Sequence, residues 1–398
     1  MTLRRRGMAR RTGMGGIVEE NIVDADNQLN GQAAGLRTLR IPALLLAGML
    51  ALSACTADGG ASPAPDESPD ESPGGGAATD APEDGDGEIS FDLSGVEITT
   101  TSTLFSGLDA SLIRVIEIVE EWGAEVDNVV LSQQSGLDAL LAGESDIAGS
   151  HDADELIIGV SGGEDLLGIG SAKSRMDYVL VAQREYETVE DLAGTTIATS
   201  GPAGFNTLLM RFALEDAGLD PDTDADLAQI GSSGDRAAAL LAGVASSAAA
   251  TIDDWFELQV QTDELHILAF FSEVRPEFPN DIYYAQRSLW EGNPDLALAW
   301  ACANLEANAW ITADQDRYIE WIAEYVDAPP EALAETWQFA VDVDMWPTDP
   351  NEIIDVDGVQ ALADILLEIG DISEPVIAEE MIDLTYLQEA ADMGCGQG

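Results

Sequence analysis

The sequence predicts an α/β protein of two lobes, each a mostly parallel sheet flanked by helices. Three observations predict this fold. Short apolar or β-branched runs alternate with amphipathic helical runs over most of the chain after residue 90, a pattern typical of parallel sheets. The 398 residues are enough for two hydrophobic cores. Polar turns follow several strands, at the edge where parallel sheets place their ligand-binding loops.

The clearest alternation lies between Tyr186 and Trp255. Thr195–Thr199 reads as a strand rich in β-branched residues, and the small-residue turn Ser200–Gly204 follows it. An amphipathic helix comes next and ends at Gly218. Two more strands are expected at residues 227–230 and 248–252, with a helix at 235–241 between them. This order predicts the parallel sheet of one lobe.

The regions on either side show the same periodicities. Before this stretch, strands are expected at residues 96–101, 126–131, 166–172 and 178–182, and helices at 111–122 and 137–142. After it, strands are expected at 265–271 and 281–286, and helices at 293–311, 315–326, 330–340, 359–369 and 375–387. Asn293-Pro294 opens the first of these helices, because proline suits the first helical turn. We therefore expect one lobe from residues 90–182 plus 283–398 and the other from 183–282, with crossovers near Ala182 and Asp281.

The N-terminal region predicts export and lipidation. A basic flank precedes the apolar run Ile41–Leu52, which is too short to span a bilayer but suits a signal-peptide core. The run ends in Leu-Ser-Ala-Cys55, which resembles the lipobox of bacterial lipoproteins. The resemblance implies that residues 1–54 are removed and that Cys55 is diacylated, which anchors the protein to the outer face of the cell membrane.

Four acidic residues between positions 19 and 26 fit a signal peptide poorly. Either the signal is unusually long or translation starts further along the chain. Residues 56–88 lack aromatic side chains and are dense in Pro, Gly, Asp, Glu and Ser, so residues 55–89 are predicted to form a lipidated cysteine and a disordered acidic tether. The tether would hold the lobes away from the membrane.

The formal net charge of −59 excludes an ordinary nucleic-acid-binding protein, which needs clustered basic residues. Lys173 is the only lysine. Two explanations of the acidic excess stay open. An acidic surface suits a salty environment, where screening weakens self-repulsion, and a GC-rich genome can also bias composition this way.

Several local motifs together resemble a known family. They are the pattern Val189-x-Asp191-Leu192-x-Gly194, the turn Ser200–Gly204, the run Ala217–Pro221 and the run Ala237–Gly243. In this order they resemble the second lobe of type II periplasmic-binding-protein-like solute-binding proteins of ABC importers, in the branch that binds nitrate, sulfonates, taurine and thiamine precursors. The resemblance covers roughly residues 95–390. One departure is Gly243-Val-Ala-Ser-Ser, where the family usually has Gly-x-Val-Asp-Ala.

The resemblance implies a monomeric binding protein rather than an enzyme. It would capture a small organic solute between its lobes, close by a hinge motion and present the solute to a permease. No cofactor is expected. Two alternatives are an enzyme similar to the thiamine-pyrimidine synthases, whose cysteine cluster this chain lacks, and a ligand-sensing surface lipoprotein.

The candidate ligand-binding residues lie in the turns that follow strands. They are Ser106, Gln133, Ser150, His151, Asp152, Ser200, Gly201, Phe205, Asn206, Asp253 and Trp255. These turns contain aspartates but no lysine or arginine, so burying an anion there would be costly, and we expect a neutral or cationic ligand. Asp152 or Asp253 would meet its polar edge, and Trp255 or Phe205 its face. Alternatively, Asp253 and Asp254 cap the following helix.

The remaining motifs point away from metal or nucleophilic chemistry. The chain has two histidines, His151 and His266, without metal-ligand spacing, and the second lies inside an apolar strand. No metal site is predicted. Cys302 and Cys395 remain after lipidation of Cys55, and export permits a disulfide, which we favour over two free thiols. That bond would attach the last residues to the helix at 293–311.

Overall fold

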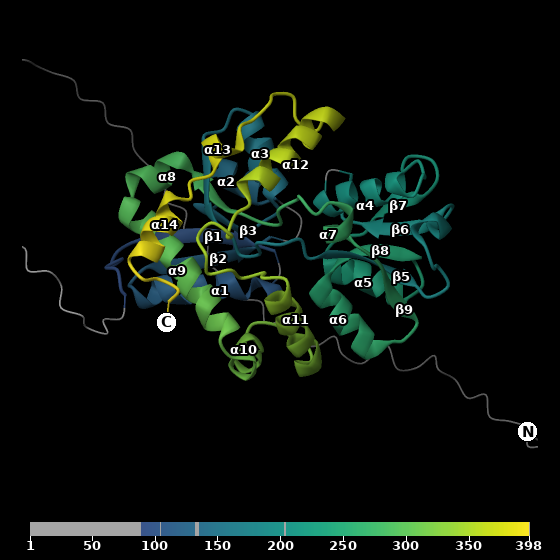
Figure 1. Ribbon diagram of the computed structural model, residues 1–398, viewed down its shortest axis with the longest axis horizontal. Coiled ribbons are helices and arrows are strands. Elements are labelled where there is room, and N and C mark those ends of the chain that lie inside the picture. Colours follow the sequence, from purple (N-terminus) through teal and green to yellow (C-terminus); the bar gives the residue numbers. More distant parts are fainter. Residues whose placement is uncertain (1–88, 104, 132–134, 203, 398) are drawn as a thin grey trace, which may run out of the picture. The chain divides into compact units, whose positions relative to one another are not determined.

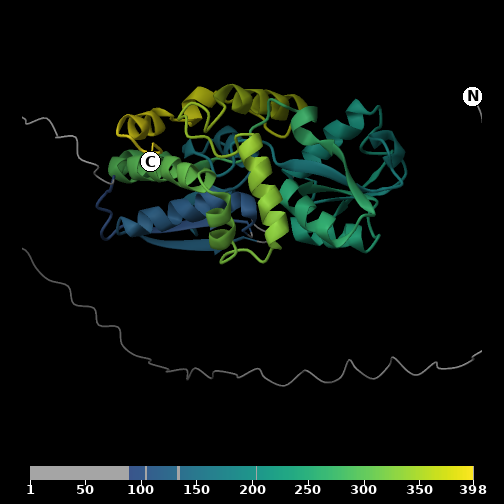
Figure 2. The same cartoon turned by 60° about the horizontal axis from the view of Figure 1, so that its bottom comes forward.

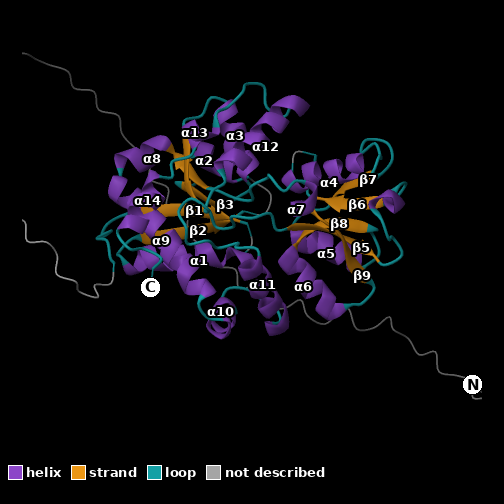
Figure 3. Cartoon of the chain, in the orientation of Figure 1, coloured by secondary structure: helices purple, strands orange, loops and turns teal. Residues whose placement is uncertain are grey.

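The computed structural model describes residues 89–103, 105–131, 135–202 and 204–397. The predicted signal peptide, Cys55, the tether up to residue 88 and Gln133 lie outside these ranges. The described residues form two five-stranded sheets, each flanked by helices (Figure 1 and Figure 3). The predicted two-lobed α/β fold is therefore confirmed.

The first sheet has the strand order β2-β1-β3-β10-β4. Its strands are β1 (Glu97–Ser102), β2 (Glu125–Val130), β3 (Ile147–Ser150), β4 (Leu166–Gly170) and β10 (Tyr283–Gln286). β1 pairs in parallel with β2 and β3, whereas β10 pairs antiparallel with β3 and β4. The only antiparallel strand of this sheet is thus the one that arrives from the second lobe.

The second sheet repeats this arrangement in the order β7-β6-β8-β5-β9. Its strands are β5 (Tyr178–Gln183), β6 (Thr196–Thr199), β7 (Asp226–Gln229), β8 (Ser247–Thr251) and β9 (Leu265–Phe270). β6 pairs in parallel with β7 and β8, and β5 lies antiparallel between β8 and β9. Both sheets are therefore mostly parallel, as predicted.

Sheet membership corrects one predicted lobe boundary. Residues 178–182, assigned from the sequence to the first lobe, belong to β5 of the second sheet, where Leu180 pairs with Ala249. The first crossover is therefore the segment 171–177, and the second is 271–282, as expected near Asp281. An apolar strand pattern shows that a segment is buried in a sheet, but hydrogen-bonded pairing decides in which sheet.

Helices fill the connections and the C-terminal third of the chain. They are α1 (Ala110–Glu121), α2 (Gly136–Ala142), α3 (Ala153–Ser161), α4 (Phe205–Asp216), α5 (Ser233–Leu241), α6 (Ile252–Gln261), α7 (Phe271–Val274), α8 (Arg287–Gly292), α9 (Pro294–Thr312), α10 (Gln315–Ile322), α11 (Pro330–Asp342), α12 (Val356–Ile369), α13 (Ala378–Met381) and α14 (Thr385–Asp392). Two 3-10 turns are η1 (Gly107–Asp109) and η2 (Val189–Leu192). No helix of the described ranges has the length and apolar character needed to cross a membrane.

The single helix predicted for residues 375–387 is wrong. The chain forms α13 and α14 instead, because the link between them binds the edge of the first sheet. Asp383 N donates to Gly168 O at 2.9 Å, and Asp383 Oδ1 then accepts from Thr385 N, where α14 begins. The helical periodicity continues through this link, but its backbone hydrogen bonds go elsewhere.

The long helix α9 is the central packing element of the first lobe. It begins at Pro294 as predicted and is buried on several sides, between α1 and α14 (Figure 2). Trp300 is fully buried, and Asn308 Oδ1 accepts a 2.7 Å hydrogen bond from Ser111 Oγ of α1. A helix that is apolar nearly all round is expected in such an interior position.

Candidate functional site

The two crossovers are fixed to each other beside the end of β3. Asp281 of the second crossover accepts hydrogen bonds at Oδ1 from Lys173 N at 2.7 Å and Ala172 N at 3.1 Å, both in the first crossover. Asp281 also forms an isolated bridge with Asp152, and Asn280 O accepts from Ala153 N of α3. The first lobe and both connections to the second lobe therefore meet at one place, which we call the lobe junction.

Lys173 occupies the centre of the lobe junction. Its Nζ lies 3.5 Å from Asp109 Oδ1, 3.7 Å from Asp177 Oδ2 and 3.8 Å from Asp281 Oδ2, and its side chain is only 13% exposed. Burial favours the neutral amine, but these three carboxylates together raise the pKa of Lys173 well above its usual value. The lysine therefore stays charged and holds η1 and the two crossovers together.

The carboxylates around Lys173 are less readily ionised than ordinary aspartates. Burial, opposed by the charge of Lys173 and aided by the charges of Asp253 and Asp152, raises the pKa of Asp177 to about 7. Burial likewise raises the pKa of Asp281 and of Asp152 to about 6. The lobe junction thus holds more negative charge than one lysine neutralises.

Two predicted serines support this charged group. Ser150 Oγ lies 2.6 Å from Asp109 Oδ1 and 3.0 Å from Asp281 Oδ2, so it bridges two of the aspartates that hold Lys173. Ser106 is the N-cap residue of η1, and its N–H donates to Asp109 Oδ2 at 2.8 Å in a capping box. Both serines lie where the sequence places them, but their hydrogen bonds are made within the protein.

His151 is a buried, neutral histidine. Its Nε2 lies 3.1 Å from Thr101 Oγ1, and burial lowers the pKa of His151 to about 4, with the Lys173 charge acting in the same direction. Gly136 packs on its ring so closely that a Cβ there would lie 2.4 Å from His151 Cδ2. This packing fixes the ring against β1 and α2.

Asp253 and Asp254 lie in the first turn of α6, and neither caps that helix. The helix begins at Ile252, with Thr251 as its N-cap residue. Asp254 Oδ2 accepts hydrogen bonds from Ser233 and from Thr251 Oγ1, and burial raises the pKa of Asp254 to about 6. Asp253 Oδ1 accepts from Asp254 N, whereas its Oδ2 has no hydrogen-bond partner among the described residues.

The turn between β6 and α4 holds itself together. Asn206 Oδ1 accepts from Ser200 N at 3.0 Å, and Asn206 Nδ2 donates to Ser200 Oγ at 2.9 Å. Gly201 has a φ of +152° and its N–H donates to Thr207 Oγ1 at 3.4 Å. The polar side chains that the sequence predicts for ligand contact therefore shape the turn.

The two predicted aromatic contacts differ in position. Phe205 is buried, with its ring centroid 6.3 Å from that of Tyr178. Tyr178 in turn donates its hydroxyl hydrogen to Asp152 Oδ1 at 3.4 Å. Phe205 is therefore connected to the lobe junction through Tyr178. Trp255 is partly buried and packs against the hydrophobic core.

The predicted turns contain no lysine or arginine. The inference that an anion there would lack a cationic partner is wrong, because two basic residues come from other segments. Lys173 is one. Arg236 of α5 is the other, and its Nε donates to Ala249 O at 2.7 Å while its NH1 donates to Gly231 O at 2.9 Å. Sequence reasoning also missed Asp109, Asp177 and Asp281. The signal that was present is the lone lysine of the chain, with an aspartate four residues later.

Two surface cavities lie away from the predicted ligand residues. One of about 710 Å³ is bounded by the first crossover, by Phe270 of β9 and Phe278 of the second crossover, and by Phe339 and Val343 near the end of α11. The other, of about 620 Å³, is lined by Arg287, Asp355 and the segment 379–385. Neither cavity includes a residue predicted to bind the ligand. Of the predicted residues, Ser150 and Asp152 contact Asp281 at the lobe junction.

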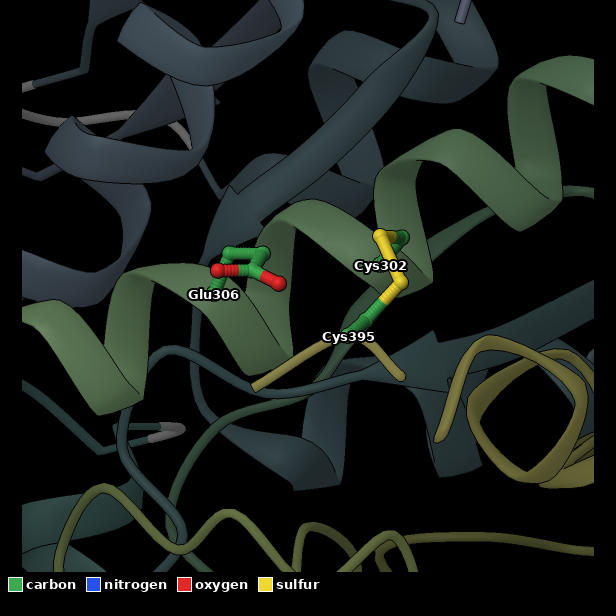
Figure 4. A group of neighbouring side chains, drawn as sticks. All are labelled: Cys302, Glu306 and Cys395. Carbon is green, nitrogen blue, oxygen red and sulfur yellow. A yellow bond between two sulfur atoms is a disulfide. The ribbon is translucent and has the colours of Figure 1, made fainter. Parts of the chain in front are cut away.

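The predicted disulfide is confirmed. Cys302 and Cys395 are bonded, with their Cα atoms 5.3 Å apart, and Glu306 lies beside them (Figure 4). The three side chains could in principle hold a metal ion, but the two sulfur atoms are bonded to each other and offer no thiolate. Glu306 Oε1 accepts a hydrogen bond from Gly396 N, so it also helps to hold the last residues on α9.

Comparisons with known proteins agree with this fold. A family model described as "NMT1/THI5 like" matches residues 120–318, which is half of the chain. No curated protein matches the sequence. The structure is similar to the periplasmic aliphatic sulphonate-binding protein SsuA from Escherichia coli, with a TM-score of 0.58 and 19% identity over 73% of this chain and 92% of that one.

Two further solved structures show the breadth of the fold. The periplasmic nitrate-binding protein NrtA from Synechocystis PCC 6803 has a TM-score of 0.59 and 14% identity, over 75% of this chain and 89% of that one. The desulfurization enzyme DszB has a TM-score of 0.53 and 15% identity, over 75% of this chain and 99% of that one. At these identities the likeness establishes the fold alone.

Proposed function

The chain belongs to the NMT1/THI5-like family, and from this premise we propose that it is the solute-binding protein of an ABC importer. The observation that carries the proposal is the lobe junction. Ser150 at the end of β3 bonds to Asp281, and the chain after β8 bonds to Asp177 through Ile252 N, so both strand ends reach the crossovers beside Lys173. Open α/β sheets bind ligands outside the carboxyl ends of their strands.

The proposed cycle requires only binding and a change of lobe orientation. A small organic solute binds between the lobes, the closed form is favoured because it contacts the solute from both sides, and the permease receives it from that form. The short segment 171–177 and the longer segment 271–282 are the hinges. Asp281 links these two segments, so they would move together.

The ligand is neutral or cationic. The reason differs from the one that the sequence suggests, because Lys173 and Arg236 are present. Three aspartates surround Lys173, and Asp152, Asp253 and Asp254 add further negative charge nearby. A buried anion would meet this excess, which is unfavourable without a paired cation.

Binding without catalysis is the favoured role. Solute-binding proteins of importers dominate the similar structures, although a desulfurization enzyme shares the fold. In the described ranges both cysteines are in the disulfide, so neither can act as a nucleophile. His151 is buried with its Nε2 bonded to Thr101, which removes it as an exposed base.

The membrane anchor is the remaining part of the proposal. Cys55 is diacylated and becomes the mature N-terminus, and a monomer tethered to the outer face of the cell membrane delivers its solute to a permease beside it. Cys55→Ala should release the protein from membranes or block its processing. Mass spectrometry that finds residues before Cys55 in the mature protein would end this part of the proposal.

Small-angle X-ray scattering tests the import function. Solutes that raise the midpoint of thermal unfolding are selected first, and the radius of gyration is then measured with and without each of them. A smaller radius with the solute supports closure between lobes. A radius that no stabilising solute changes would count against the importer role and favour a sensor or adhesion role.

A further inference from the structure

We propose that Asp177 and Asp253 form the recognition site for an organic cation that carries N–H donors, such as a protonated amine, an amidinium or a guanidinium. The inference rests on the proposed solute-binding function and names the class of solute. It is carried by two neighbouring buried carboxylates whose oxygen atoms lack hydrogen-bond donors in the described part of the chain.

The hydrogen bonding of these two residues sets them apart from the other junction carboxylates. Asp281 and Asp109 accept several hydrogen bonds from serines and backbone N–H groups. Asp177 is 1% exposed, yet within the described ranges neither of its oxygens accepts a hydrogen bond, and its ion pair there is with Lys173 Nζ, at 3.7 Å. Asp253 is 5% exposed, with Oδ2 unpaired. Buried carboxylates without donors are costly, so a native site of this kind favours a ligand that supplies them.

The backbone brings the two residues together at one edge of the second sheet. Tyr178 pairs with Thr251 where β5 begins and β8 ends, and Ile252 N donates to Asp177 O at 2.9 Å. Asp253 directly follows Ile252 in the chain. A ligand held there would contact both the C-terminal end of β8 and the first crossover.

This edge faces the first lobe. Burial raises the pKa of Tyr318 in α10 well above its usual value, and the charges of Asp253 and Asp109 add to the effect. Tyr318 itself donates its hydroxyl hydrogen to Gly107 O of η1 at 2.8 Å. The helix α6, with Asp253 in its first turn, packs against α11 of the first lobe, where the ring centroids of Phe256 and Phe339 lie 6.2 Å apart. A cation at this edge would therefore lie beside both lobes.

The arrangement suits an organic cation better than a metal ion. Hard divalent cations need several oxygen ligands that converge on one point. Over the described ranges, the only three acidic, histidine or cysteine side chains close enough to share an ion are Cys302, Glu306 and Cys395, far from this edge in sequence. Asp177 and Asp253 instead offer separate acceptors, which a cation with several N–H groups can satisfy at once.

The test compares matched probes on the purified full chain at constant ionic strength. Benzamidine and putrescine supply N–H cations. Benzamide is the neutral isostere of benzamidine, choline is a cation whose nitrogen carries no hydrogen, and ethanesulfonate and nitrate are anions. The midpoint of thermal unfolding is measured for each, and affinities follow by calorimetry.

Benzamidine or putrescine should raise the midpoint at millimolar concentration, while benzamide and choline should have little effect. Asp177→Asn and Asp253→Asn should each weaken the N–H cation by about tenfold or more, the factor for losing a hydrogen bond to a charged group. Asp222→Asn is the matched control. It removes one charge from an exposed ion pair with Arg211 and should leave affinity unchanged.

The ligand-free variants give a second measurement that does not depend on the probe. Asp177→Asn should unfold at a higher midpoint than the native chain, because it replaces a buried carboxylate that accepts no hydrogen bond by a neutral group of the same shape, while Asp109 and Asp281 still pair with Lys173. Three results would overturn the cation site: neither N–H cation stabilises the chain, both Asn variants bind it unchanged, or Asp177→Asn lowers the midpoint. Stabilisation by ethanesulfonate or nitrate with a reduced radius of gyration would refute the cation site and leave the import function standing.

Discussion

Replacing Lys173 by methionine would test whether this lysine holds the lobe junction together. The change keeps the length of the side chain and removes its charge, which leaves Asp109, Asp177 and Asp281 without their shared cation. At distances of 3.5 to 3.8 Å, each ion pair provides roughly 4–5 kcal/mol of gross attraction at an effective dielectric constant near 20. Desolvation and repulsion among the carboxylates offset most of that sum. Loss of one partner of a buried ion pair typically costs about 3–5 kcal/mol, which is the cost we expect near pH 8.

The pH dependence follows from the raised pKa of Asp177, which is about 7 in the folded protein. An unfolded aspartate has a pKa near 3.9, so between these values the folded chain binds more protons than the unfolded chain. The contribution of Asp177 to stability therefore falls as the pH rises through this range. Without Lys173 the pKa rises further, so the cost of Lys173→Met should be largest near pH 8 and should shrink near pH 5, where protonation relieves the carboxylates.

Urea unfolding of both proteins at the two pH values measures this cost. Arg175→Met is the matched control, since it removes a neighbouring cation whose partners Asp344 and Glu352 are exposed. Exposed ion pairs contribute about 1 kcal/mol or less. The reasoning fails if Lys173→Met costs no more than Arg175→Met, or if its cost is the same at both pH values.

Three further predictions concern other parts of the chain. Reduction of the disulfide between Cys302 and Cys395, which are 93 residues apart, should lower the unfolding free energy by about 4–5 kcal/mol on the chain-entropy model. An unchanged urea midpoint with reductant would contradict this. Lys173 is the only lysine, and because it is buried and charged, an amine-reactive ester should label it much more slowly than the α-amino group. Labelling at equal rates, followed by peptide mapping, would show that the lobe junction is open in solution. Gly136→Ala places a Cβ against the His151 ring and should destabilise the fold by about 1–3 kcal/mol in thermal or urea unfolding; native stability would show that the ring moves freely.

Much of the fold is predictable because local periodicity and capping chemistry decide it. The helix opened by Pro294 and the disulfide follow from local motifs and from the redox environment. The assignment of residues 178–182 to the first lobe failed, because an antiparallel strand in the middle of a sheet has the same apolar pattern as its parallel neighbours. The break between α13 and α14 was equally hidden, since it depends on a backbone hydrogen bond from Asp383 to Gly168 far earlier in the chain.

The candidate site was predicted in part. The strand-end rule located Ser150 and Asp152 at the lobe junction, and Asp253 beside Asp177. The same rule missed Lys173 and Asp177, because they lie in a crossover that arrives at those strand ends from a different part of the chain. Side chains such as Asn206 follow a strand as predicted but form hydrogen bonds within their own turn. The sequence alone does not show which partner a polar side chain will bond to.

The charge of the chain explains why the acidic residues of the junction were hard to recognise. With 75 acidic residues, an aspartate at the end of a strand carries little information by itself. Burial separates the groups. The buried acidic residues of the described ranges, each no more than 5% exposed, are all aspartates, namely Asp109, Asp154, Asp177, Asp253 and Asp281. Four of these five lie around Lys173 or beside it at the start of α6. A biased composition or a salty environment acts on exposed charges, which salt screens, whereas buried charges are screened much less. Neither explanation of the acidic surface therefore accounts for these aspartates, and a role in holding Lys173 and a solute does.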